Sequence, residues 1–119
     1  MKLAIVRIAD RSVPNKERLH LKALSDTNLS FFAVLATVYS SPTAISTLPR
    51  YVFWFKSKPV KAGDNIILCT AEGTPSEEKN ADGTTTYFFY WGLKNTIWNK
   101  TGECAVIFEI NSWQTSPYE

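Results

Sequence analysis

Apolar segments of strand length recur along this chain, some of them alternating with polar residues at a period of two, and no segment has apolar residues at helical spacing over a useful length. The segment RLHLKALS (18–25) is the clearest case, because its apolar residues occupy every second position. The segment FFAVLATVY (31–39) is apolar on both faces and rich in β-formers, as in a strand that is covered on both sides. On this basis we predict strands at 2–9, 18–25, 31–39, 50–56, 65–71, 86–91 and 104–110.

Turn residues separate these predicted strands. All five glycines stand at or beside a strand end, where they fit turns better than a phosphate-binding loop. In NKTG (99–102), Asn99 and Gly102 are the residue types that a type I turn favours at its first and fourth positions. The pattern predicts an all-β fold, a sandwich or small barrel, that forms a single domain over residues 1–119.

Two aromatic strands, 50–56 and 86–91, carry large apolar side chains on both faces. Alternation puts Tyr87, Phe89 and Trp91 on one face of the second strand. Because a sandwich buries only one face of each sheet, we expect the second face to be covered by a protein partner, by a second copy of the chain, or by the chain's own segments 2–9 and 112–119. The residues that we assign to this candidate interaction face are Trp54, Phe88 and Tyr90.

The distribution of charge is uneven although the net charge is only +2. Residues 1–61 hold ten Lys or Arg and three Asp or Glu, a balance of +7, whereas residues 62–119 have a balance of −5. Such asymmetry marks either an anion-binding or self-complementary surface, or two halves that interleave in space and leave a mixed surface. We expect the interleaved arrangement.

A basic turn, KSKPVK (56–61), follows the aromatic strand YVFWF. Its lysines would contact phosphates while the neighbouring aromatic residues stack on bases, which is a known mechanism of nucleic-acid binding. The alternative is that the lysines keep a strand edge soluble. The candidate anion or nucleic-acid contacts are Lys56, Lys58 and Lys61.

Residues for catalysis or metal binding are few. The single histidine, His20, is expected on the solvent side of an alternating strand, and no serine lies in a nucleophile elbow. Cys69 and Cys104 lie in apolar strands and are expected as buried free thiols, with a disulfide between neighbouring strands as the alternative. The acidic stretch at 72–83 lacks the ligand spacing of an EF-hand. We therefore predict no catalytic residue, metal site or cofactor.

The N-terminal segment does not have the pattern of a targeting signal. The apolar run that follows Lys2 ends at Arg7, which makes it too short for a secretory signal, and no stretch approaches the roughly 20 apolar residues of a membrane span. The sequence therefore predicts a cytoplasmic protein without a membrane segment.

The order of motifs in the second half resembles a known family. KPVKAGDNIILCTAEGT (58–74) is similar to the Pro-Gly-x-x-Val-x-Leu-x-Thr hairpin of bacterial lamin tail domains. FFYWGLKNTIWNKTGECAVIFE (88–109) is similar to their Tyr-Trp-Gly, Trp-Asn and Gly-Asp/Glu elements, in the same order. The resemblance covers residues 17–113 and is most specific over 59–110. It departs at Lys61-Ala62, where the family places Pro beside the Gly, in a longer acidic stretch at 72–86, and in the added strand and loop of residues 1–16.

This resemblance implies an immunoglobulin-like antiparallel β-sandwich of about 7–9 strands, which agrees with the strand pattern. In the family, the domain serves as a module for interaction with proteins and DNA, and it provides no catalytic residues. We therefore expect a non-catalytic binding or scaffolding module that acts through protein–protein interaction or self-association, with a homodimer as one outcome. Nucleic-acid binding through the basic turn is the alternative function.

Overall fold

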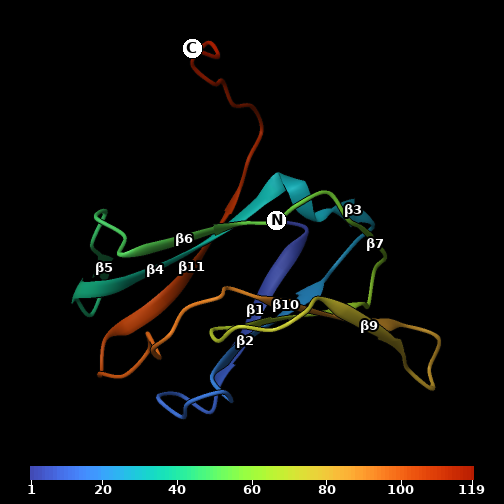
Figure 1. Cartoon of the computed structure of the whole chain (residues 1–119), viewed down its shortest axis with the longest axis horizontal. Coiled ribbons are helices and arrows are strands. Elements are labelled where there is room, and N and C mark those ends of the chain that lie inside the picture. Colours follow the sequence, from blue (N-terminus) through green and yellow to red (C-terminus); the bar gives the residue numbers. More distant parts are fainter.

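A computed structural model describes residues 1–119, of which 46% are in strands and 3% in helix. Two main sheets form two layers (Figure 1). The first sheet has the order β1 (Leu3–Ala9), β2 (Arg18–Ala23), β8 (Asn65–Cys69), β10 (Thr85–Tyr90) and β9 (Ser76–Lys79). In the second sheet, β4 (Phe32–Ser41) pairs with β11 (Glu103–Glu109) on one edge and with β6 (Tyr51–Trp54) and β5 (Ala44–Ile45) on the other. A small ladder joins β3 (Thr27–Asn28) to β7 (Pro59–Val60), and the 3-10 turn η1 (Leu29–Phe31) precedes β4.

All seven predicted strands are present, with ends within two residues of the expected positions. Four further short strands, β3, β5, β7 and β9, bring the total to eleven, which is above the expected seven to nine. Strand β9 lies inside the acidic stretch 72–83, where the sequence predicts no strand. All four of its residues are exposed, so burial imposes no apolar alternation on it.

The two main sheets are antiparallel except at one pair. Strands β8 and β10 run parallel, with Ile66 beside Tyr87 and Cys69 beside Tyr90. Parallel neighbours need a long crossover, and residues 70–84 provide it by carrying the chain past the position of β10 to form β9 at the edge. Strand β10 then folds back against β9 and inserts beside β8.

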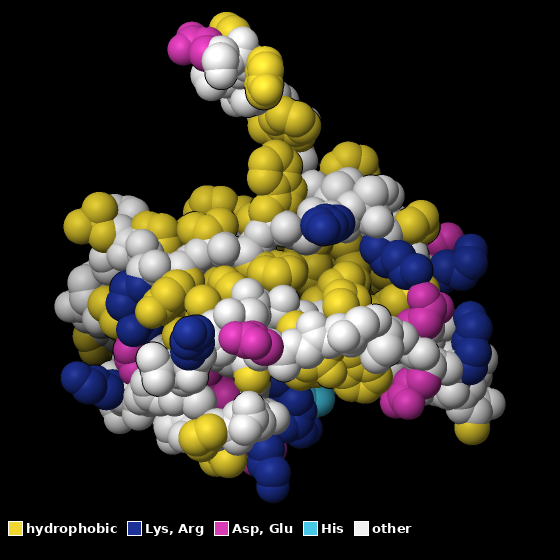
Figure 2. Space-filling view, viewed as in Figure 1, with side chains coloured by type: hydrophobic (Ala, Val, Ile, Leu, Met, Phe, Trp, Pro, Cys, Tyr) yellow, Lys and Arg dark blue, Asp and Glu magenta, His cyan; other side chains and the backbone are white.

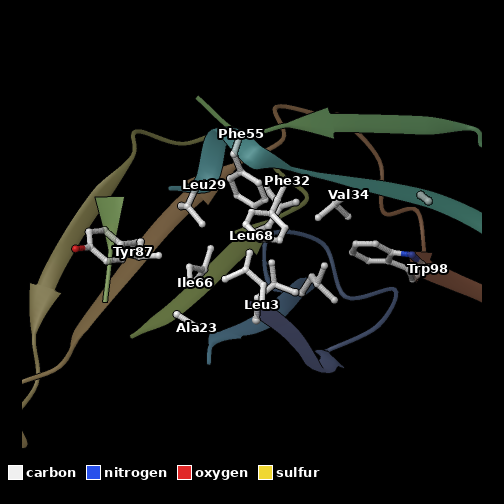
Figure 3. Packing of buried hydrophobic residues seen from close by; sticks show 14 of the residues in the cluster. Leu3, Ala23, Leu29, Phe32, Val34, Phe55, Ile66, Leu68, Tyr87 and Trp98 are labelled. Carbon is white, nitrogen blue, oxygen red and sulfur yellow. The ribbon is translucent and has the colours of Figure 1, made fainter. Parts of the chain in front are cut away.

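The core lies between the two sheets (Figure 3). The first sheet contributes leucines such as Leu19 and Leu68, and the second contributes Phe32 and Val34. The strand faces follow the predicted alternation. The inward set of the two aromatic strands, which is packed in or against the core, consists of Phe53, Phe55, Tyr87, Phe89 and Trp91.

A series of edge-to-face aromatic contacts crosses this core. Ring centroids lie 5.3 Å apart between Phe89 and Phe55, 5.1 Å between Phe55 and Phe53, and 5.7 Å between Phe53 and Trp91. Trp91 then contacts Trp98 at 6.0 Å, and Trp98 is completely buried. Each such pair contributes about 0.5–1.5 kcal/mol beyond the burial of its area. The aromatic residues in and just after β6 and β10 therefore connect the two sheets.

A buried carboxylate joins three separate connections at one end of the sandwich. Glu17, which is 2% exposed, accepts hydrogen bonds from the backbone N–H of Ser12 (2.8 Å) and the hydroxyl of Thr70 (2.8 Å). It also accepts hydrogen bonds from the backbone N–H groups of Ile97 (2.8 Å) and Trp98 (3.1 Å). Four donors satisfy the lone pairs of both oxygens, as a buried charge requires. The segments before β2, after β8 and before β11 are thereby held together.

Ion pairs connect the basic and acidic halves of the chain. Arg50 pairs with Glu103 at 2.9 Å, and Lys58 pairs with Glu77 at 2.9 Å. Two of the three ion pairs therefore join the two halves, as expected for an interleaved arrangement. The N-terminal segment does not cover a second aromatic face; it forms the edge strand β1 and buries Leu3 in the core. The helical part of the chain is the three-residue turn η1, so no helix here could span a membrane.

The turn before β11 lies one residue later than the sequence indicates. The N–H of Glu103 donates to the carbonyl of Lys100 at 3.1 Å, so the hydrogen-bonded turn spans 100–103. Gly102 occupies its third position with a φ of 90°. That conformation is typical of a type II turn, which needs glycine there, and not of the expected type I turn.

We predict that Glu17→Gln lowers the free energy of unfolding by about 3–5 kcal/mol, because an amide group would turn an N–H toward donors that need an acceptor. Urea denaturation followed by tryptophan fluorescence measures the change. The matched control is Glu78→Gln on the exposed strand β9, which should change stability by less than about 0.5 kcal/mol. A loss below about 1 kcal/mol for Glu17→Gln would show that the carboxylate is not a main structural link.

Candidate interaction face

Two cross-strand rows on the outward side of the sheet formed by β11, β4 and β6 are apolar across all three strands. Alternation explains this arrangement, because the neighbouring residues Val34 and Ile107 point into or against the core. Six outward residues form two cross-strand rows, which we call the outer face: Phe108–Ala33–Trp54 and Val106–Leu35–Val52.

Much of the outer face is open to solvent. Val52 is 56% exposed, Phe108 is 52% exposed and Trp54 is 47% exposed, and none of the six residues is charged. Hydrophobic side chains run from the upper edge of the body into the base of the projecting C-terminal segment (Figure 2). Contiguous apolar patches of this kind usually mark interaction sites on soluble proteins.

The orientation of Trp54 is fixed by two contacts. Its indole Nε1–H donates to the backbone carbonyl of Ser30 at 2.9 Å. The ring of Trp113, from the segment after β11, packs edge-on against it at 5.3 Å and 85°. Trp113 nevertheless remains 66% exposed. The outer face therefore presents a rigid aromatic anchor that the chain itself covers only in part.

The structure does not bring Phe88 and Tyr90 together with Trp54. Both lie on the outward side of β10, in the other sheet. Phe88 lines a hollow of about 360 Å³ beside His20. The loop at Gly73 lies against the ring of Tyr90, so closely that a Cβ atom there would come within 2.4 Å of the ring. Of the three candidate residues, only Trp54 belongs to the outer face.

The three lysines of the basic turn have different surroundings. Lys58 pairs with Glu77 and lies 5.3 Å from the ring centroid of Tyr87. The ion pair raises the pKa of Lys58 and keeps it protonated. Lys61 lines a hollow of about 390 Å³ together with Asp26 and Asp64, and Lys56 is exposed. Carboxylates therefore offset part of the positive charge of this turn.

His20 is more enclosed than a solvent-facing residue. It lies in β2 beside Arg7 of β1 and Ile67 of β8, and its Nε2 atom is buried without a hydrogen-bond partner. Burial lowers the pKa of His20, and the positive charges of Arg18 and Arg7 lower it further. Both effects favour the neutral imidazole.

Other reactive groups are dispersed. Cys69 in β8 and Cys104 in β11 are free and lie in different sheets. Burial raises the pKa of both thiols, which disfavours the nucleophilic thiolate. A hollow of about 660 Å³ lies beside Glu17, but hydrogen bonds occupy that carboxylate. No group of three His, Cys, Asp or Glu side chains is positioned to hold a metal ion.

Only part of this face could be recognised from the sequence. Alternation in ECAVIFE places Val106 and Phe108 opposite Ala105 and Ile107, and could have identified the contribution of β11. Trp113 lies outside any strand, so no periodicity predicts its contact with Trp54.

A scan against protein-family models finds no family that matches this chain, and a search of curated proteins finds no relative.

We predict that the His20 signal in an NMR pH titration has a midpoint below about 6.5, the value of an unperturbed histidine. Because the pKa is lowered in the folded state, the unfolded state binds more protons between the two pKa values. The contribution of His20 to stability is therefore fully present above about pH 6.5 and is lost as the pH falls through the pKa of the folded state. The chain has one histidine, so the assignment is unambiguous. A midpoint at or above 6.5 would show that the ring is solvated in solution.

Proposed function

We propose that this chain is a non-catalytic protein-interaction module that binds a second copy of itself through the outer face. The observation that carries the proposal is a continuous, uncharged apolar surface over β11, β4 and β6 in which Trp54 is held in one orientation. Fixed aromatic side chains lose little entropy on association, and they are frequent hot spots of interfaces.

A second copy is the partner that the composition of the face favours. A two-fold contact brings the same patch of both subunits together, so a patch with like charges would repel itself. The outer face has no charge, and the nearby Arg50 is already paired with Glu103 within its own chain. Self-association therefore buries apolar area without separating or opposing charges.

We also propose that the fold is an immunoglobulin-like sandwich of the lamin tail type. The order of motifs over residues 59–110 supports this assignment, and the two-layered all-β architecture is compatible with it. A role in protein interaction agrees with what that family does. The parallel pair of β8 and β10 departs from the antiparallel sandwich that the sequence predicts.

Nucleic-acid binding through Lys56, Lys58 and Lys61 has less support. Lys58 already pairs with Glu77, and Lys61 lies near Asp26 and Asp64. Few cations then remain for phosphate contacts. A gel shift at about 50 mM salt that weakens steeply with added salt would favour this alternative, and the absence of a shift would remove it.

We predict that the intact protein forms dimers and that Val52→Lys weakens them about tenfold or more, because it places a charge in the apolar contact. Sedimentation velocity up to about 100 µM measures the association. The matched control is Val6→Lys. Val6 and Val52 are both 56% exposed, but Val6 lies on β1 in the other sheet.

Circular dichroism should show that both variants remain folded. Equal weakening by Val6→Lys and Val52→Lys would indicate a general effect of charge rather than a contact at the outer face. A protein that stays monomeric at about 100 µM would contradict self-association as its function, since a micromolar dimer is saturated there.

A further inference from the structure

The segment after β11 leaves the body of the molecule (Figure 1). The N–H of Ile110 donates to the carbonyl of Phe31 at 2.6 Å, which fixes the point of exit. Residues 111–119, which we call the tail, are all exposed, and Tyr118 is fully exposed. The tail carries two large aromatic rings, Trp113 and Tyr118, and its only charged side chain is Glu119.

Trp113 shows that the outer face accepts an aromatic side chain from the tail. Its ring meets Trp54 edge-on, a geometry that is favourable for aromatic pairs. The contact is incomplete, because Trp113 is 66% exposed and both Val52 and Phe108 remain more than half exposed. Since Ile110 is anchored only three positions earlier, the tail reaches the Trp54 end of its own outer face and is then directed away from the body.

We propose that the tail of one copy docks on the outer face of a second copy, with Trp113 and Tyr118 as its anchoring side chains. This inference deepens the proposed self-association by naming the segment that makes the contact. A two-fold axis would let each copy donate its tail and receive that of its partner. The tail spans about 30 Å when extended, which is enough to cross a three-stranded face and reach a neighbouring domain.

The area of such an exchange matches what a stable dimer needs. Two aromatic side chains bury about 300–500 Å² for each tail, and the receiving face loses a similar area. Two reciprocal contacts would then bury about 1,200–2,000 Å² in total, which is the range of specific protein interfaces. A single tail on its own body would bury at most half of this area.

Mixing two full-length variants tests the exchange. The tail variant, Trp113→Ser with Tyr118→Ser, keeps an intact outer face. The face variant, Val52→Lys with Phe108→Lys, keeps an intact tail. Each variant alone should associate about tenfold or more weakly than the original protein, but a mixture should form a one-sided heterodimer. Fluorescence anisotropy of a labelled face variant, titrated with tail variant to about 200 µM, measures this complex.

Gln114→Ser with Ser116→Ala provides the matched control, since it alters the tail without removing an aromatic ring. This variant should associate like the original protein. A tail variant that also associates like the original would overturn the inference. The proposed function would still stand in that case if Val52→Lys prevents association.

Loss of association in the tail variant without complementation in the mixture would show that the tail acts only on its own body, which overturns the exchange. A monomeric original protein at about 100 µM would overturn both the exchange and the proposed function. Circular dichroism and urea denaturation should show native stability in the tail variant, because neither Trp113 nor Tyr118 belongs to the core.

Discussion

The arrangement of this molecule depends on the buried carboxylate of Glu17. Its four donors come from three connections that are distant in sequence: the β1–β2 loop, the end of β8, and the segment between β10 and β11. The last of these carries the chain from one sheet to the other. By holding the N–H groups of Ile97 and Trp98, the carboxylate fixes where that crossing begins and places the Trp98 ring in the core.

The two sides of β4 have different roles in the structure. Phe32, Val34 and Ala36 point inward and are completely buried, whereas Ala33 and Leu35 form the middle of the outer face. Because β4 pairs with β11 on one edge and β6 on the other, a rigid core determines the spacing of the residues on the exposed side. The outer face is thus supported by a strand whose inward residues are completely buried, which favours a preorganised binding surface.

Local alternation allowed the strand positions and their faces to be predicted, as in β10, where Tyr87 and Phe89 lie inward and Phe88 and Tyr90 outward. It could not show which sheet each strand joins, so Trp54 and Phe88 seemed to share a face. The role of Glu17 was also hidden, because its partners Thr70 and Ile97 lie far along the chain. The parallel register of β8 and β10 depends on the path of the intervening strand β9, which has no apolar pattern to reveal it.

The other outward side of the same molecule shows that an apolar outer face is not a consequence of forming strands. In the first sheet, the residues that point away from the core are mixed. Arg18, His20 and Lys22 of β2, Asn65 of β8 and Thr86 of β10 are polar, whereas Ile67 of β8 and Phe88 of β10 are apolar. The outer face of β11, β4 and β6 has no polar residue in either of its rows. Water solvates exposed polar side chains without penalty, whereas each Å² of exposed apolar surface costs about 25 cal/mol relative to burial. Association that covers the outer face recovers this free energy, whereas covering the outward side of the first sheet would also bury charged residues such as Arg18 and Lys22.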